Sequence, residues 1–213
     1  NMGTIARIIT QHFSEKEDKA RAVFSWIATH IAYETNTGRA NNPKYNTTDV
    51  VLKNRKATSG GYAALFQDMC SIADIRCLTV DGYLRKTTDD ILEPNIEINH
   101  TWNVVQLGQS PDTWYYVDVT LASGWIDKKT KTFIPHFNDA YFFANKNVFN
   151  LQHYPDNIHW QLGKGPKSLK DFYQLPIIKD GAYLFTLEKM LPSQGLIKAK
   201  TSQPINFNFS FIP

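Results

Sequence analysis

The amino-acid sequence predicts an α+β fold, in which N-terminal helices pack on an antiparallel sheet and a β-rich extension follows. Apolar residues recur at helical spacing within residues 16–33. Two alternating stretches, residues 99–107 and 113–121, flank a short link that contains Gly and Pro, as the strands of a hairpin do. From residue 166 onwards, short apolar stretches separated by Pro and Gly are typical of part of a β-sandwich.

The composition is that of one substantial folded domain with an appendage. The 213 residues are 42% hydrophobic and 13% aromatic, which is ample for a large core. A Gly/Lys/Pro-rich link separates a domain over residues 1–165 from a β-rich extension over residues 166–213, whose last strands could continue in a longer natural chain. A net charge of +3 without a basic tract argues against a nucleic-acid partner. No apolar run approaches the roughly 20 residues of a membrane-spanning helix.

The predicted elements follow from the apolar spacing and from the turn residues between them. The helix over residues 16–33 places Ala20, Val23 and Phe24 on one face, and Ser14 with Glu17 reads as a capping box before it. The other predicted elements are a loop over residues 35–48, a short helix over 49–53, a helix from Ser59 to about residue 73, a strand over 77–84, a polar loop over 86–97, the two strands of the hairpin, and strands over 182–187, 197–200 and 205–211.

The functional prediction depends on the stretch from Arg55 to Phe66, RKATSGGYAALF. A polar run and a Gly pair precede the spacing of a buried helix face, which puts Ser59 at or just before a helix N-terminus. Free N–H groups and the helix dipole favour an anion there, which suits a nucleophile and the oxyanion that it creates. The alternative is that Ser59 is simply an N-cap, which is the more frequent role of Ser at such a position.

The hairpin supplies a candidate partner for that nucleophile. A turn centred on Gln109 and Ser110 puts His100 opposite Asp118, or within two residues of it, and opposed residues have Cβ atoms about 5 Å apart. A carboxylate beside a His fixes the imidazole tautomer and supports general-base catalysis. A surface His–Asp pair is the alternative, although two neighbouring aromatic residues favour a partly enclosed setting. The expected pairs on this face are His100 with Asp118, Trp102 with Tyr116, and Val104 with Trp114.

Other chemically reactive residues carry weaker signals. Cys70 and Cys77 lie in apolar surroundings, as core cysteines do, and they make no disulfide framework. Cys70 lies about three helical turns beyond Ser59, away from the favourable end of the helix dipole, so we do not predict it as the nucleophile. His153 and His159 have no recognised ligand spacing, and the acidic residues of the 86–97 loop are scattered, so no metal site is expected.

Three stretches stand in an order and spacing that have a counterpart in a known family: RKATSGGYA at residues 55–63, HTWN at 100–103 and DVT at 118–120. They resemble the nucleophile motif R-K-G-x-C-x-G-Y-A, the motif H-x-W-N and the acid motif D-x-T of the transglutaminase-like superfamily, which shares the papain-like cysteine-protease core. The helix end at residues 26–33 is also similar to that family. The run over residues 139–162 resembles its bacterial branch, near the kyphoscoliosis-peptidase and cytokinesis-associated members. The likeness covers about residues 15–162.

The resemblance implies acyl transfer on an amide. Position 59 would attack the carbonyl, His100 would act as base and then as acid, and Asp118 would orient His100. The backbone N–H of residue 59 would contribute to the oxyanion hole. No cofactor and no metal are implied. The substrate-binding residues implied by the resemblance are Trp102, Gly60 and Tyr62.

The sequence departs from the family at its centre, where Ser59 stands in place of the catalytic Cys. A thiol is readily ionised by an imidazolium and a helix N-terminus, whereas an alcohol, whose pKa lies far above that of a thiol, is much harder to activate. The protein is therefore expected to be inactive as it stands, through an engineered Cys-to-Ser change or as a natural pseudoenzyme. The sequence leaves open whether it is an enzyme.

The active parent would be a cysteine protease, amidase or acyltransferase with a peptide or protein substrate, cell-wall peptide included. The competing hypothesis is a pseudoenzyme that binds a peptide or glycan in the same groove, with the exposed-looking aromatic residues of the run from Tyr141 to Trp160 as part of its surface. The alternative for these aromatic residues is that they belong to the core. The family likeness and the sandwich-like tail favour an exported bacterial protein of the periplasm or cell envelope.

Overall fold

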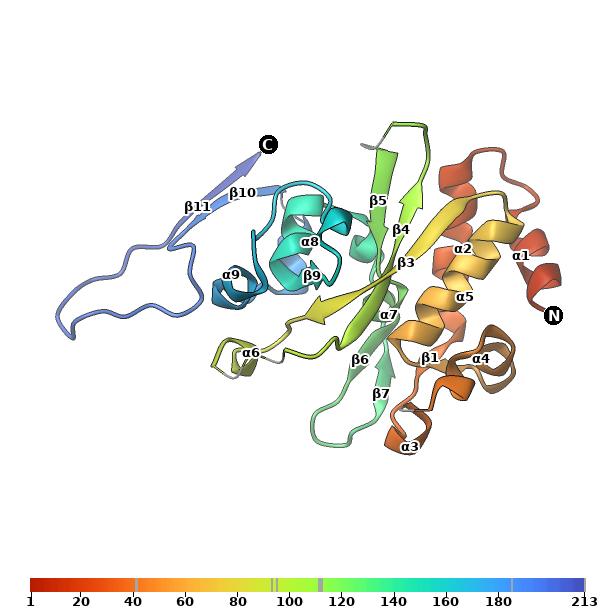
Figure 1. The fold of residues 1–213 in the computed structure, drawn as a ribbon, viewed down its shortest axis with the longest axis horizontal. Coiled ribbons are helices and arrows are strands. Elements are labelled where there is room, and N and C mark those ends of the chain that lie inside the picture. The colour runs from red at the N-terminus through yellow and green to blue at the C-terminus, as the bar shows by residue number, and fades with distance from the viewer. Residues whose placement is uncertain (41, 93, 95, 111–112, 185, 213) are drawn as a thin grey trace. The chain divides into compact units, whose positions relative to one another are not determined.

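The computed structural model describes residues 1–213 apart from residues 41, 93, 95, 111, 112, 185 and 213. It confirms the α+β class (Figure 1). The α-helices, strands and 3-10 helices (η) are, in chain order, α1 (Met2–Thr10), α2 (Lys16–His30), β1 (Ala32–Tyr33), α3 (Thr37–Ala40), η1 (Pro43–Asn46), α4 (Thr48–Asn54), β2 (Lys56–Ala57), α5 (Ser59–Ile72), β3 (Arg76–Leu84), α6 (Asp89–Leu92), β4 (His100–Gln106), β5 (Trp114–Val117), α7 (Val119–Ser123), β6 (Gly124–Ile126), β7 (Phe133–Pro135), η3 (Asp139–Tyr141), β8 (Phe142–Ala144), α8 (Lys146–Gln152), β9 (His153–Pro155), η4 (Ile158–Trp160), α9 (Leu169–Gln174), η5 (Asp180–Leu184), β10 (Thr186–Leu191) and β11 (Asn208–Ile212).

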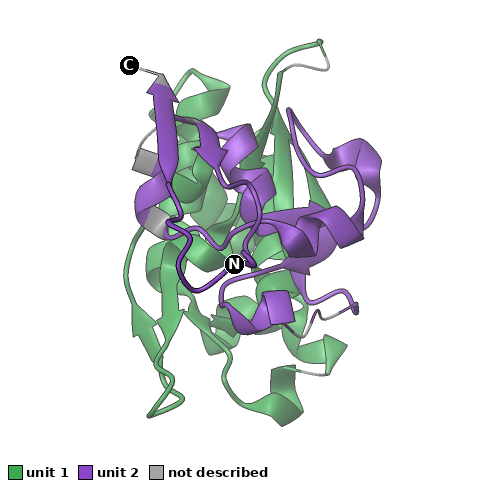
Figure 2. Cartoon of the chain, turned by 90° about the vertical axis from the view of Figure 1, so that its left-hand side faces the viewer, with its two compact units in different colours: residues 1–80, 101–143 green, residues 81–100, 144–213 purple. Residues whose placement is uncertain are grey.

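The chain forms two compact units, each made of two segments (Figure 2). Unit 1 consists of residues 1–80 and 101–143, and unit 2 consists of residues 81–100 and 144–213. The boundary expected at residue 165 stays a prediction.

The helices of unit 1 follow the apolar spacing of the sequence. α2 begins at Lys16 as predicted and buries Val23, Phe24 and Ile27, and it packs beside α5 (Figure 1). The predicted capping box is wrong. The N-cap residue is Glu15, which makes no side-chain cap hydrogen bond, and Ser14 donates its hydroxyl to the Glu15 carboxylate instead.

The 35–48 stretch is more ordered than the predicted loop, because it contains α3 and η1. α4 then forms as expected and ends at Arg55, whose φ of 55° lies in the left-handed region. β2 follows and pairs in parallel with β1, so that Ala32 lies opposite Lys56 and Tyr33 lies opposite Ala57. This short pair fixes the backbone immediately before α5.

In unit 1, β5 lies between β8 and β4, and β4 lies between β5 and β3. The antiparallel register pairs Val104 with Tyr116 and Gln106 with Trp114, so the predicted pairing is wrong by two residues. The reason is the turn, where Thr113 donates both its N–H and its hydroxyl to the Ser110 carbonyl and so moves the centre of the hairpin. Because the faces of a strand alternate with a period of two, each side chain keeps its predicted face. Pro111 and Asp112 of this turn lie outside the described residues.

The second hairpin strand is shorter than predicted. It was expected to reach Leu121, but β5 ends at Val117 and Asp118 caps the N-terminus of α7. A carboxylate that accepts a hydrogen bond from a helix N-terminus competes with strand continuation, which the alternating apolar pattern does not reveal.

Unit 2 has its own core around β3, β9 and α9. The end of β3 pairs antiparallel with β9, and the buried aromatic residues Tyr83, Tyr154, Phe172 and Tyr173 pack together. Arg85 lies inside this unit with no exposed surface. Its Nη1 and Nη2 each donate at 2.8 Å, to the carbonyls of Leu175 and Leu151, and its guanidinium lies 4.4 Å from the Phe172 ring centroid.

The C-terminal extension has fewer strands than expected. β10 and β11 form a two-stranded antiparallel sheet, whereas residues 197–200 are not a strand. Of the predicted 182–187 strand, residues 182–184 belong to the 3-10 helix η5 and residues 186–187 belong to β10. Phe207, Phe209 and Phe211 alternate along this hairpin and are each at least half exposed. Among the described residues, no helix combines the length and the apolar character that crossing a membrane requires.

We expect Arg85→Lys to lower the free energy of unfolding by about 1.5–3 kcal/mol, because an ammonium group cannot reproduce the planar fork that reaches both carbonyls. Burial lowers the pKa of Arg85 to about 10, so it is charged at neutral pH and its lost hydrogen bonds are charge-assisted. Urea unfolding measures the change. Arg76→Lys is the matched control. Arg76 is exposed, its Nη1 donates to Gln106, and its guanidinium lies 5.3 Å from the Trp114 ring centroid, so a change within about 0.5 kcal/mol is expected there. Equal effects of the two substitutions would contradict the structural role of Arg85.

Candidate active site

Ser59 is the first helical residue of α5, and the N-cap residue is Thr58. The alternative that Ser59 is itself the N-cap is therefore wrong. The first hydrogen bond of the helix runs from the Tyr62 N–H to the Thr58 carbonyl, at 3.0 Å. Ser59 is half-buried.

The start of α5 lacks a side-chain cap. Thr58 makes no cap hydrogen bond. The N–H groups of Ser59, Gly60 and Gly61 donate to no backbone or side-chain acceptor in the part of the chain that the structure describes. Unengaged N–H groups at a helix N-terminus can bind an acceptor such as the oxygen of a carbonyl under attack. Ser59 and Gly60 are half-buried, whereas Gly61 is buried.

The two glycines that follow Ser59 differ in their surroundings. A Cβ built on Gly60 meets no heavy atom within 4 Å, so there is open space directly beside Ser59. A Cβ on Gly61 would lie 2.8 Å from Asn46 Oδ1 and 3.0 Å from the Ala57 Cβ. Gly60 therefore offers room for a substrate, whereas Gly61 permits a close approach of the chain that precedes the helix.

Tyr62 faces the core. It is fully buried, and its hydroxyl donates to the carbonyl of Ile31 at the end of α2. Burial raises the pKa of Tyr62 above its ordinary value. The expected substrate contact of Tyr62 stays a prediction. What the structure shows is a hydroxyl that joins α2 to α5.

Asn103 connects α5 to the sheet. Its Nδ2 donates to the carbonyl of Ala63 in α5 at 3.0 Å and to the carbonyl of Leu78 in β3 at 3.3 Å. Asn103 is 1% exposed, so these bonds are made in the core. Its neighbour Trp102 is equally buried within β4, and its role in substrate binding stays a prediction.

Asp118 has no exposed surface and is held at both its backbone and its side chain. Its N–H donates to the Tyr141 carbonyl at 3.0 Å, and its Oδ1 accepts from the Leu121 N–H at 2.9 Å. These bonds fix the carboxylate at the start of α7, where the positive end of the helix favours its ionised form.

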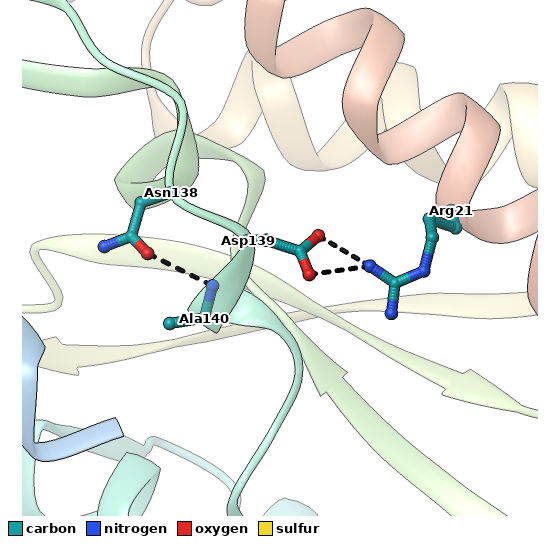
Figure 3. Close-up of polar contacts among 4 residues, drawn as sticks. All are labelled: Arg21, Asn138, Asp139 and Ala140. Carbon is teal, nitrogen blue, oxygen red and sulfur yellow. Dashed lines mark hydrogen bonds and ion pairs between the residues drawn. The ribbon is translucent and has the colours of Figure 1, made fainter. Parts of the chain in front are cut away.

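The segment that holds Asp118 is anchored to α2 (Figure 3). The Nη1 of Arg21 lies 2.6 and 2.7 Å from the two carboxylate oxygens of Asp139 in η3, and Asn138 Oδ1 accepts from the Ala140 N–H at 3.1 Å. The Arg21 guanidinium also lies 4.3 Å from the centroid of the Phe142 ring. α2 therefore supports the position of Asp118 through η3.

His100 is the first residue of β4, at the point where the chain passes from unit 2 into unit 1. It is 5% exposed. Within unit 2 its ring centroid lies 5.7 Å from that of His153, whose ring stacks on Phe149 at 3.6 Å. His153 is buried and His159 is exposed.

The remaining candidates from the sequence belong to the core. Cys70 and Cys77 are free and buried, and burial raises the pKa of the Cys70 thiol, which makes it a poor nucleophile. Several aromatic residues of the run from Tyr141 to Trp160 are buried, among them Tyr141, Phe142, Phe149 and Tyr154, so for these the core alternative holds.

Comparison with known proteins identifies the family. The family model of the transglutaminase-like superfamily matches residues 3–119, a segment that contains Ser59, His100 and Asp118. The chain belongs to the transglutaminase-like superfamily.

The chain is also similar to individual proteins and to solved structures. The chain is 35% identical over 160 residues to the kyphoscoliosis peptidase of Mus musculus, covering 73% of this chain and 23% of that protein. It is 28% identical over 137 residues to cytokinesis protein 3 of Schizosaccharomyces pombe, covering 64% of this chain and 15% of that protein. Among solved structures it is similar to a TGase at 16% identity and a TM-score of 0.39, over 56% of this chain and 30% of that one. The chain thus spans about a quarter or less of the curated relatives named here.

Two positioning groups could not be found from the sequence. Asn46 lies in the stretch predicted as a loop and contacts Thr58 twelve residues later. The pair of Arg21 and Asp139 joins residues 118 positions apart. Neither contact has a local signature. Asn103, in contrast, could be recognised from the sequence, because it stands inside the H-x-W-N motif.

We expect Asn103→Ala to lower the free energy of unfolding by about 1–3 kcal/mol, because it removes two buried hydrogen bonds, those to the carbonyls of Ala63 and Leu78. The matched control is Asn99→Ala, since Asn99 is exposed and also bridges backbone groups, those of Leu84. Its expected cost is below about 1 kcal/mol. Urea unfolding measures the free energy of unfolding of both variants. An Asn103→Ala variant that is no less stable than the Asn99→Ala variant would contradict this role.

Proposed function

We propose that this transglutaminase-like domain carries an acyl-transfer site in which residue 59 is the nucleophile position, His100 the base and Asp118 the group that orients it. One observation carries the proposal: residue 59 opens α5 beside unengaged N–H groups and open space at Gly60. Family membership and the buried, doubly held Asp118 support it.

In this mechanism the side chain of residue 59 attacks an amide carbonyl as its proton passes to the imidazole of His100. The new C–O or C–S bond leaves a negative charge on the carbonyl oxygen, and the N–H groups at the start of α5 stabilise it. His100 then gives its proton to the leaving amine, and the acyl group passes from residue 59 to water or to another amine. Asp118 holds His100 in the required tautomer.

With Ser at position 59, the proposed site is inactive or nearly so. The thiolate–imidazolium pair that such a site forms with Cys has no equivalent with an alcohol, because its pKa lies far above that of a thiol and keeps it protonated. The substrate class is a peptide or protein, with cell-wall peptide as one candidate. The second proposal is a binding role: the open space beside Ser59 would hold a peptide or glycan without turnover.

From the family likeness and the β-rich tail we also propose an exported bacterial protein of the periplasm or cell envelope. The kyphoscoliosis peptidase and cytokinesis protein 3 that the chain resembles come from a mouse and a yeast.

The test is the rate at which iodoacetamide alkylates a Ser59→Cys variant between pH 5 and 9. An intact site should give a thiol pKa at least one unit below the ordinary value of about 8.5, and His100→Ala in the same background should raise it again. The protein with Ser59 is the blank, because its own thiols at Cys70 and Cys77 are buried. His159→Ala, which removes an exposed imidazole, should change nothing.

Labelling no faster than that of an ordinary thiol, or unaffected by His100→Ala, would remove the acyl-transfer proposal. The binding role would then stand, and retained affinity for a peptide or glycan without turnover would support it.

A further inference from the structure

Thr58, the residue before the nucleophile position, does not make the hydrogen bond that is expected of a Thr at a helix N-cap. Thr58 is the N-cap of α5, where a Thr hydroxyl normally accepts from the N–H two or three residues on, here that of Gly60 or Gly61. It makes no such bond. Instead the hydroxyl donates to Asn46 Oδ1 at 2.8 Å, and the Thr58 N–H donates to the same oxygen at 3.0 Å.

The orientation of the Asn46 amide follows from these contacts. A backbone N–H can only donate, so the Asn46 atom that it meets must be the oxygen. The same oxygen then accepts the single hydrogen of the Thr58 hydroxyl. The backbone N–H and the hydroxyl of Thr58 therefore both donate to the side chain of Asn46 in η1, and η1 packs against α5.

Gly61 makes this arrangement possible. A Cβ at that position would lie 2.8 Å from Asn46 Oδ1, closer than Cβ contacts come, so any side chain there would push the Asn46 oxygen away. Glycine at the third helical position also removes the Glu or Gln that would complete a capping box. Two side chains usually accept hydrogen bonds at a helix N-terminus, that of the N-cap and that of the third helical residue. At the start of α5 neither of them does so.

We propose that Asn46 is a positioning residue for the nucleophile site, and that it acts by keeping the Thr58 hydroxyl out of the cap position. The N–H groups at the start of α5 then stay open to the oxyanion, or to the anionic form of the nucleophile. The inference rests on the proposed function in so far as residue 59 is the nucleophile. It does not depend on His100.

The thiol pKa of the Ser59→Cys variant reports on these N–H groups directly. Asn46→Ala should release the Thr58 hydroxyl to cap the helix, and the thiol pKa should rise by about one unit. Alkylation at pH 6 should then be about tenfold slower, because the thiolate fraction falls tenfold per unit. Thr58→Val added to Asn46→Ala removes the competing hydroxyl and should return the pKa to within about 0.3 of the parent value.

Two controls separate this role from a merely structural one. Asn42→Ala removes an Asn of the same segment that caps η1 through the Lys44 N–H, and it should leave the thiol pKa unchanged. Thr58→Val alone should also leave the pKa unchanged, because the hydroxyl occupies no cap to begin with. The neighbouring charged groups, Glu34, Arg55 and Lys56, are common to every variant.

The inference fails if Asn46→Ala leaves the pKa unchanged, if Thr58→Val does not restore it, or if Thr58→Val alone shifts it by more than about half a unit. Should Asn46→Ala not fold by circular dichroism, Gly61→Ala displaces the Asn46 oxygen instead and should give the same rise and the same rescue. His100→Ala, measured in parallel, tests the proposed function separately. A pKa insensitive to His100 but raised by Asn46→Ala would remove the triad and keep the Asn46 inference.

Discussion

The side-chain amide of Asn103 is the contact on which the relation between α5 and the sheet of unit 1 depends. It donates to one carbonyl of the helix and to one of β3, in a core that is otherwise largely apolar. Apolar packing alone tolerates sliding, because it has no direction, whereas two hydrogen bonds from one amide are satisfied at a single position of the helix. The helical acceptor, Ala63, lies one turn after Ser59, so this contact sets how far the helix N-terminus extends beyond the strands.

The start of α5 is held from its other side by the chain that leads into it. β1 and β2 fix the backbone as far as Ala57, and Asn46 fixes Thr58. Ser59 therefore follows a fully restrained backbone, yet the N–H groups of its helix remain unengaged. A side-chain cap is typically worth about 1 kcal/mol of stability. Because other contacts restrain this helix end, it can form without the side-chain cap. Its N–H groups then remain as donors where a charge can develop.

The parts of the fold that could be predicted are those that follow from the local spacing of apolar residues. α2 and α5 follow from apolar residues three and four apart, and β4 follows from alternation. The end of β5 could not be predicted, because Asp118 is the N-cap of α7 although the alternating apolar pattern continues beyond it. The register was missed because Thr113 bonds to Ser110 inside the turn, which shifts the pairing by two residues without changing the face of any side chain.

The candidate site shows the same division between local and distant information. The position of residue 59 at a helix start is local and was predicted, whereas the residue that keeps this start uncapped, Asn46, lies in a separate element. The distinction bears on how Ser at position 59 is to be understood. Had the site decayed towards an ordinary helix terminus, Thr58 would be free to take the cap, which needs no change of residue at that position. Its hydroxyl is instead held by Asn46, in a contact that only glycine at position 61 allows. Under the proposed function, the groups that would stabilise an anion at residue 59 surround a side chain that does not readily form one.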